Sequence, residues 1–255
     1  MEGKLEHPFC YEKKGATTMV IMIHGILESP RQFLRFAQAM KEVGCSYDVI
    51  SLPGHGGTGE EFAKSNRAQW EREVQRKVKC YKTRYSDIVL IGHSMGGLLA
   101  MQAYEWNTDV VKSLILIATP LRVRVKPHMV LDGWKVIMHH VEQDDLGAFY
   151  AREAIGVGRG SVGLYYKWIP RYLELFAMVR QARKRVSNIK VPVLVIQSKR
   201  DEFVSKGSVY LFEKKLPRIE RILWLKHSRH FRYDGEELSG ILKECKRFVR
   251  HTVIQ

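Results

Sequence analysis

The sequence lacks any long uninterrupted apolar run of the kind that a transmembrane helix needs. Its first fifteen residues are mixed and charged and lack the apolar segment of a secretory signal peptide, so we expect the protein in the cytoplasm. Only four cysteines occur, scattered without the spacing of a metal site, so we expect reduced thiols, no metal and no redox chemistry. Internal repeats, low-complexity tracts and long linkers are absent too. These absences leave a globular protein with one large core.

Acidic residues are too few to balance the basic ones. The chain has 42 Lys and Arg against 27 Asp and Glu, a formal net charge of +15. A positive surface attracts polyanions without needing a specific site. No nucleic-acid-binding motif accompanies the charge, so we interpret it as a solvated basic surface and expect no specific nucleic-acid partner.

The stretch from Ser86 to Tyr104 has the pattern of a buried strand that turns abruptly into a helix. The apolar run 88–91 is followed by a glycine-rich turn in which Ser94 stands between Gly92 and Gly96. Small residues on both sides suit a strained turn that leaves no room for side chains beside the serine. The pattern predicts an exposed serine hydroxyl at the turn, although glycines near a serine also mark ordinary loops.

Strands and helices alternate along most of the chain. Ser29 followed by Pro30 predicts a helix start after the first strand, and the stretch 53–59 is too glycine-rich for a regular element. Strands separated by helices favour a mostly parallel sheet with helices on both faces, an α/β fold. The apolar runs predict strands at 17–23, 49–52, 88–91, 113–118, 193–196 and 222–225.

Residues 121–187 interrupt this alternation. They are rich in aromatic and basic residues and predict a mostly helical cap, which leaves 1–120 and 188–255 as the core domain. A cap of this kind would wall a substrate pocket, although aromatic residues also attach such an insertion to the core. The substrate-binding candidates are Trp134, Tyr165, Trp168 and Phe176.

Two further polar residues follow predicted strands. Asp201 comes after the strand at 193–196, and His230 comes after the strand at 222–225. A serine hydroxyl is a weak nucleophile that needs a base, and the base needs a group that fixes its tautomer. Ser94, Asp201 and His230 therefore predict a catalytic triad.

Several separated motifs together resemble one family. They are His24-Gly25, Pro53-Gly54-His55-Gly56, the turn 92–97, Asp201 and Ser228-Arg229-His230. The chain is similar over nearly its whole length to α/β-hydrolases of the small carboxylesterase and monoacylglycerol-lipase-like group. Arg229 stands where members of that group commonly have glycine.

The resemblance implies an α/β-hydrolase fold with an inserted helical cap. It also implies an oxyanion hole formed by the backbone N–H groups of Ile26 and Met95, and it implies no cofactor. His24, His55 and His93 are interpreted as residues that hold loops, because the sequence positions no carboxylate for them.

The leading hypothesis is a serine hydrolase that cleaves small to medium acyl or aryl esters, or monoacylglycerol, through an acyl-enzyme on Ser94. An acyltransferase and a hydrolase of amide or C–C bonds remain open, because they use the same triad chemistry. A non-catalytic binding module would be expected to replace a triad residue, and none is replaced. A polyanion-binding protein would be retained on heparin without esterase activity. The oligomeric state is left open.

Overall fold

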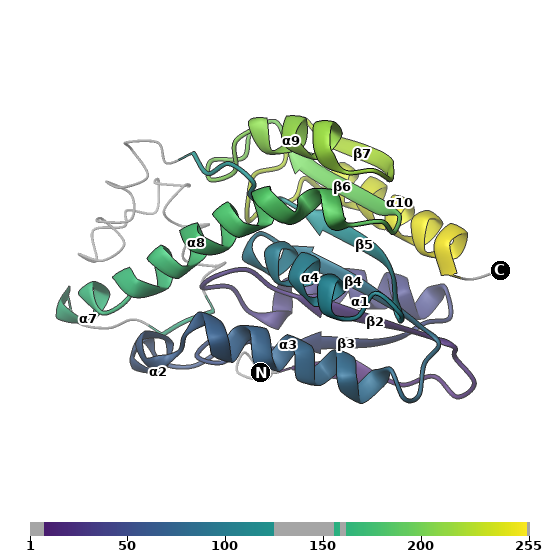
Figure 1. Ribbon diagram of the computed structural model, residues 1–255, viewed down its shortest axis with the longest axis horizontal. Coiled ribbons are helices and arrows are strands. Elements are labelled where there is room, and N and C mark those ends of the chain that lie inside the picture. The colour runs from purple at the N-terminus through teal and green to yellow at the C-terminus, as the bar shows by residue number, and fades with distance from the viewer. Residues whose placement is uncertain (1–7, 125–155, 159–161, 254–255) are drawn as a thin grey trace.

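The structure is a computed structural model that describes residues 8–124, 156–158 and 162–253. Its centre is a seven-stranded sheet in the order β1-β3-β2-β4-β5-β6-β7 (Figure 1). All neighbouring strands are parallel except β1, which pairs antiparallel with β3. The strands are β1 (Phe9–Tyr11), β2 (Thr18–Ile23), β3 (Ser46–Ile50), β4 (Asp87–His93), β5 (Val111–Ile117), β6 (Val193–Ser198) and β7 (Ile219–Leu225).

Helices cover both faces of this sheet. One hydrophobic cluster joins the sheet to α1 and α10, and a second joins its other face to α3, α4, α8 and α9. The predicted α/β class and the six predicted strands are therefore confirmed, with β1 as an additional edge strand too short to recognise in the sequence. The helices are α1 (Leu34–Glu42), α2 (Gly59–Lys64), α3 (Arg67–Tyr81), α4 (Met95–Trp106), α7 (Val162–Tyr166), α8 (Ile169–Arg185), α9 (Gly207–Lys215) and α10 (Gly235–Val253).

Strand β2 illustrates why the sequence forms this sheet. Successive side chains of a strand point to opposite faces. Met19 and Ile21 accordingly belong to the cluster under α3 and α4, whereas Val20 and Met22 belong to the cluster under α1 and α10. All four are fully buried. A strand buried on both faces needs a continuous apolar run, and β2 has one.

Two local predictions are refined. Helical structure begins at Pro30 after Ser29, as predicted, but as a 3-10 turn (Pro30–Phe33) without a side-chain cap from Ser29, and α1 begins only at Leu34. The stretch predicted to be irregular ends in α2, which begins at Gly59. Thr58 accepts the backbone N–H of Glu61, and the Glu61 side chain accepts the N–H of Thr58. This capping box overrides the local excess of glycine.

The predicted cap, residues 121–187, is described only in part. Helices α7 and α8 fall within it, and α8 packs against α4 (Figure 1). Residues 125–155 and 159–161 lie outside the described residues, so the boundaries of the cap stay a prediction. Among the helices of the described ranges, none combines the length and apolar character required to cross a bilayer.

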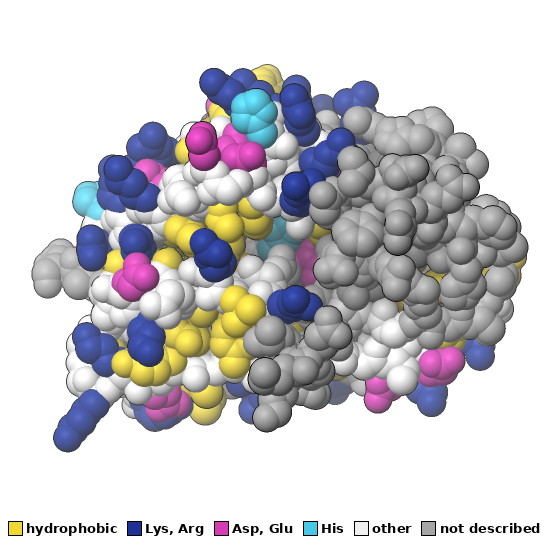
Figure 2. Space-filling view, turned by 180° about the vertical axis from the view of Figure 1, so that it is seen from behind, with side chains coloured by type: hydrophobic (Ala, Val, Ile, Leu, Met, Phe, Trp, Pro, Cys, Tyr) yellow, Lys and Arg dark blue, Asp and Glu magenta, His cyan; other side chains and the backbone are white. Residues whose placement is uncertain are grey.

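The basic side chains do not form one block on the face seen in Figure 2. Lys and Arg are scattered there among hydrophobic and uncharged side chains over the described part of the surface. On the described part of this face the positive charge is spread over the surface.

Candidate active site

Ser94 lies at the junction of β4 and α4 and has a backbone conformation that residues other than glycine rarely adopt. Its φ is 53° and its ψ is −119°. The turn is held by hydrogen bonds from Ser94 N to Ile117 O (2.9 Å) and from Gly97 N to Ser94 O (3.0 Å). A Cβ on Gly92 would collide with the backbone of residue 96, and one on Gly96 would collide with the backbone carbonyl of Ile23. The flanking glycines are therefore required by close backbone packing.

Positive φ angles mark this edge of the sheet. The non-glycine residues that the described chain holds in this region are Leu27 (62°), Ser94 (53°) and Ala118 (47°). Each follows the carboxyl end of a parallel strand, β2, β4 or β5 respectively. Strained backbone of this kind persists only where surrounding contacts impose it and gathers at functional sites. The strain therefore points to the same edge as the predicted serine.

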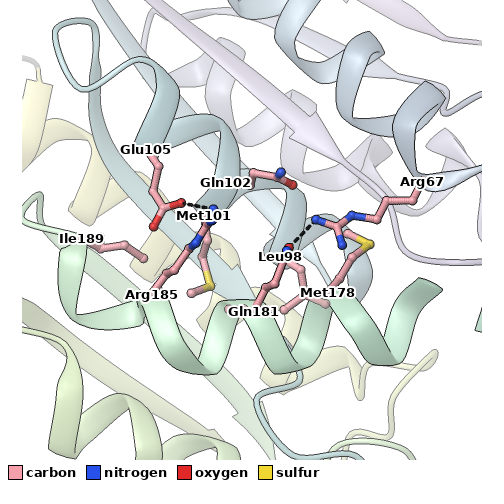
Figure 3. Close-up of a pocket in the computed structure, with 10 residues that line it drawn as sticks. Arg67, Leu98, Met101, Gln102, Glu105, Met178, Gln181, Arg185 and Ile189 are labelled. Atoms are coloured by element: carbon pink, nitrogen blue, oxygen red, sulfur yellow. Dashed lines mark hydrogen bonds and ion pairs between the residues drawn. The ribbon is translucent and has the colours of Figure 1, made fainter. Parts of the chain in front are cut away.

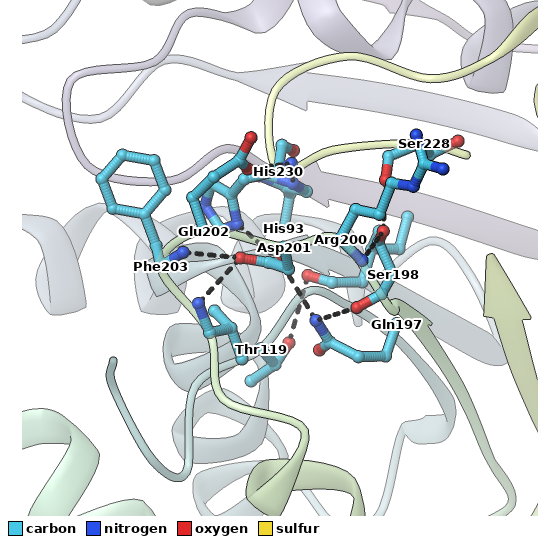
Figure 4. Close-up of polar contacts among 12 residues, drawn as sticks. His93, Thr119, Gln197, Ser198, Arg200, Asp201, Glu202, Phe203, Ser228 and His230 are labelled. Carbon is cyan, nitrogen blue, oxygen red and sulfur yellow. Dashed lines mark hydrogen bonds and ion pairs between the residues drawn. The ribbon is translucent and has the colours of Figure 1, made fainter. Parts of the chain in front are cut away.

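Asp201 and His230 meet after β6 and β7, as predicted. His230 Nδ1 lies 2.9 Å from Asp201 Oδ2, and both side chains are buried. The other oxygen of Asp201 accepts the N–H groups of Phe203 (2.9 Å) and Val204 (2.7 Å). Gln197 Nε2 donates to Oδ2 (3.0 Å), so Asp201 is fixed from three sides (Figure 4). Because an ionised carboxylate only accepts, Nδ1 of His230 carries hydrogen and Nε2 is left as the possible base.

Asp201 and His230 each stabilise the charged form of the other. Burial by itself would lower the pKa of His230, but the charge and hydrogen bond of Asp201 outweigh it and raise that pKa. Burial would raise the pKa of Asp201, and the charge and hydrogen bond of His230 lower it instead. The described contacts include no hydrogen bond between Ser94 and His230. Catalytic hydrogen bonds of free enzymes are often formed only when substrate binds.

The predicted oxyanion donors, Ile26 and Met95, lie after β2 and at the start of α4. Met95 is the first residue of α4, where backbone N–H groups have no partner within the helix. Ile26 lies in the loop after β2, next to Gly25, whose N–H is bound by Glu28 Oε2 (2.5 Å). Within the described part of the chain, neither Ile26 N nor Met95 N donates a hydrogen bond. Both N–H groups are therefore available to an anion.

Glu202 supports the base loop, a role that the sequence did not reveal. Its Oε2 accepts the backbone N–H of His230 (3.2 Å), and its Oε1 lies 3.0 Å from Arg229 Nη1. Arg229, the departure from the family pattern, is thereby attached to the segment that carries Asp201. Glu237 binds the same loop from α10 by accepting the N–H groups of residues 226–228.

Two aromatic rings flank the imidazole of His230. The ring centroids of Phe203 and Phe231 lie 5.1 and 4.7 Å from that of His230. Phe203 is 37% exposed, so it presents apolar surface beside the base. Sequence reasoning missed both residues, although each stands one or two positions from a predicted triad member.

The buried histidines near the site differ in their hydrogen-bond partners. His24 Nε2 accepts the N–H of Leu52 (3.0 Å), so its Nδ1 must donate to Gly25 O (2.8 Å) and the ring is neutral. Burial lowers the pKa of His55 to about 3, which also keeps that ring neutral. These two histidines hold loops, as expected from the sequence.

His93 has a carboxylate partner, contrary to the expectation from the sequence. Its Nδ1 lies 3.0 Å from Oε2 and 2.8 Å from Oε1 of Glu28, a residue that is only 3% exposed. Its Nε2 lies 3.1 Å from the backbone carbonyl of His230. Burial would raise the pKa of Glu28, but the charge and hydrogen bond of His93 outweigh it and lower that pKa to about 2.

Glu28, His93 and His230 are the described residues whose ligand-type atoms come together, all within 4.8 Å. Both nitrogens of His93 are engaged, by Glu28 and by the carbonyl of His230, and Nδ1 of His230 is engaged by Asp201. Among these ring nitrogens only Nε2 of His230 lacks a described partner, and one unengaged nitrogen favours a proton network over a metal centre. The absence of a metal stays a prediction.

The predicted substrate-binding residues fall into different environments. Trp168 is buried, and its indole donates to Gly59 O (3.0 Å), which argues against substrate contact. Phe176 is 46% exposed on α8 and belongs to neither core cluster. Tyr165 is partly buried, with its ring 4.8 Å from that of Trp168. Trp134 lies outside the described residues.

A small hollow between α4 and α8 is a separate feature (Figure 3). It encloses about 20 Å³, room for about one water molecule. Side chains from both helices line it, and the lining residues include Arg185 and Glu105, which form an ion pair (3.2 Å). None of the predicted site residues lines this hollow.

A family model described as alpha/beta hydrolase fold matches residues 18–185. The chain belongs to this family. This membership agrees with the mostly parallel sheet, and with the positions of Ser94, Asp201 and His230 after β4, β6 and β7.

Relatives of known name match three quarters or more of the chain. A thermostable monoacylglycerol lipase of Bacillus sp. (strain H-257) is 22% identical over 91% of this chain and 90% of its own length. The phospholipase YtpA of Bacillus subtilis (strain 168) is 25% identical over 75% of this chain and 78% of its own. A solved structure from work on two metagenome-derived lipolytic enzymes, LipS and LipT, has a TM-score of 0.74 at 21% identity and covers 97% of this chain and 98% of its own.

Proposed function

We propose that the protein is a serine hydrolase that cleaves carboxylic esters through an acyl-enzyme on Ser94. The observation that carries the proposal is the buried hydrogen bond of 2.9 Å between His230 and Asp201. The backbone of His230 contacts His93 (3.1 Å), the residue directly before Ser94 on its strained turn. The α/β-hydrolase family and its lipase relatives support ester hydrolysis in particular.

The first half of the reaction forms the acyl-enzyme. Ser94 Oγ attacks the ester carbonyl carbon, and Nε2 of His230 takes the hydroxyl proton. The negative charge that develops on the carbonyl oxygen is stabilised by the N–H groups of Ile26 and Met95. Asp201 stabilises the imidazolium, in keeping with the raised pKa of His230. When the tetrahedral intermediate collapses, the C–O bond to the alcohol breaks and His230 gives its proton to that oxygen.

The second half regenerates the serine. Water attacks the acyl carbonyl while His230 removes one of its protons, and collapse releases the carboxylic acid as Ser94 recovers its proton. An alcohol in place of water would give acyl transfer by the same steps, so the two activities are separated by measuring products.

The substrates are proposed to be small or medium acyl or aryl esters. Phe203 gives apolar surface next to the base, and Tyr165 supplies apolar surface near the start of α8. The helical cap at 121–187 is proposed to restrict access from above, so that long chains and large polymers are disfavoured.

Labelling with a fluorophosphonate probe, combined with hydrolysis of a chain-length series of p-nitrophenyl esters, tests this function. We expect one covalent label on Ser94, no label on a Ser94→Ala variant, and highest turnover on short or medium esters. A label on another serine, or an optimum on long-chain triacylglycerol emulsions, would contradict the proposal. Retention on heparin without any label would favour a polyanion-binding protein instead.

A further inference from the structure

The contacts of His93 require more protons than a neutral histidine carries. Its Nε2 faces the backbone carbonyl of His230 (3.1 Å), which can only accept, so Nε2 must carry hydrogen. A neutral ring would then leave Nδ1 as an acceptor, and Nδ1 faces the carboxylate of Glu28. Two acceptors cannot bond to each other, so one additional proton must lie between His93 and Glu28.

The carboxylate itself indicates on which side that proton lies. Oε2 of Glu28 accepts the N–H of Gly25 and the side-chain N–H of Gln32, both at 2.5 Å. These donors stabilise the ionised carboxylate. The lowered pKa of Glu28 agrees with this form. The pair is therefore best written as a buried glutamate beside a protonated His93.

This pair touches three segments that carry the proposed reacting groups. Gly25, bound by Glu28, directly precedes the oxyanion donor Ile26. His93 directly precedes Ser94 and binds the backbone of His230. Glu28 and His93 thus link the ends of β2, β4 and β7. These segments carry the serine, the base and the oxyanion donors, which must keep fixed positions relative to one another.

The charge of Glu28 also bears on the base. The rings of His93 and His230 lie 4.9 Å apart, centroid to centroid. A protonated His93 without a counter-ion would oppose protonation of His230, which the reaction requires. Glu28 cancels that charge.

We infer that Glu28 and His93 form a proton-sharing ion pair that positions the oxyanion loop and the catalytic base together, which makes Glu28 a positioning residue for the hydrolysis. The inference rests on the proposed function for its kinetic part, but its proton is observable without turnover.

Three variants test the inference. Glu28→Ala removes the acceptor for Gly25 and His93, and we expect kcat to fall by about 10- to 100-fold with KM within about threefold, because a misplacement of reacting groups by about 1 Å can cost about 100-fold in rate. In Glu28→Gln the amide can still accept from Gly25 and can donate to a neutral His93, so activity should recover to within about fivefold of wild type. Asp48→Asn is the matched control, a buried carboxylate bonded to Lys77 and Tyr81, and it should leave kcat unchanged.

Proton NMR reads the shared proton directly. We expect two strongly downfield resonances, one that disappears in Asp201→Asn and a second that disappears in Glu28→Gln. If Glu28→Ala does not fold, Glu28→Gln still decides the question through this signal. A downfield pattern unchanged by Glu28→Gln, a kcat unchanged by Glu28→Ala, or a loss confined to KM would overturn the inference. Failure of wild type to label or turn over would instead refute the proposed function.

Discussion

The site contains two buried carboxylate–histidine pairs that differ in the environment of the second ring nitrogen. In the first, Asp201 binds Nδ1 of His230 at 2.9 Å, and Nε2 of that ring has no protein partner among the described contacts. In the second, Glu28 binds Nδ1 of His93, and Nε2 is occupied by a backbone carbonyl. Only the first histidine has a nitrogen free to exchange a proton with a substrate.

The comparison teaches that a carboxylate beside a histidine does not by itself define a catalytic base. What matters is the state of the second nitrogen. A ring with both nitrogens bound to acceptors is held protonated and becomes a structural cation. A ring with one free nitrogen can be neutral at rest and charged during the reaction.

Removal of His230, the histidine of the first pair, should have the largest effect on activity. His230→Ala is expected to lower kcat by about 10⁴-fold or more, because the serine then has no base. His227→Ala, an exposed control three residues away, should keep nearly full activity. The measurement is steady-state hydrolysis of a p-nitrophenyl ester by folded protein. Reversal of the two results would move the base to His227.

Removing the charge of Asp201 should have the next largest effect. Asp201→Asn is expected to lower kcat by about 10³- to 10⁴-fold, since the amide no longer favours the correct tautomer. Asp201 raises the pKa of His230, so its loss should lower that pKa and move the acid limb of the kcat/KM profile to lower pH. An acid limb that stays in place would exclude Asp201 as the partner of the base.

Glu202→Gln is the matched control for Asp201. The amide oxygen can still accept the N–H of His230, so activity should stay within about threefold of wild type. Equal losses of kcat in Asp201→Asn and Glu202→Gln would contradict these two assignments. Asp201 would then not be the carboxylate that orients the ring, as distinct from Glu202, which binds the backbone.

The second pair should contribute to stability in a defined pH range. The pKa of Glu28 is about 2 in the folded state against 4.5 for an ordinary glutamate. Its contribution is therefore complete above about pH 4.5 and is lost as the pH falls toward 2, with an upper limit on the order of 3 kcal/mol. The difference in free energy of unfolding between wild type and Glu28→Gln should be largest at pH 7, clearly smaller at pH 3, and should approach zero only as the pH falls to about 2. A constant difference would contradict the ion pair.

The smallest effect is expected far from both pairs. Trp168→Phe removes the hydrogen bond to Gly59 O and should lower the free energy of unfolding by about 1 kcal/mol. Because Trp168 is buried, the ester chain-length preference should not change. If a folded Trp168→Phe protein had a shifted ester chain-length preference, Trp168 would have to be assigned to the substrate pocket after all.

Most of the fold could be predicted from local pattern. The apolar runs placed the strands β2 to β6, because a strand buried on both faces leaves a continuous hydrophobic signal. The run at 222–225 also located β7, an edge strand that is only partly buried. The edge strand β1 was not predicted, since three residues are too few to show a periodic pattern of apolar side chains. The start of α2 was missed because the capping box of Thr58 and Glu61 was hidden in a glycine-rich stretch.

By itself the sequence determined the strand–helix alternation and the candidates Ser94, Asp201 and His230, since each follows an apolar run that ends at the same edge of a parallel sheet. Only the tertiary structure paired Glu28 with His93, 65 residues apart, and bound Glu202 to the backbone of His230. It also buried Trp168 and left Phe176 exposed, which composition could not distinguish. The physical reason is that a strand records its burial in its own residues, whereas the partner of a buried charge depends on how distant loops meet.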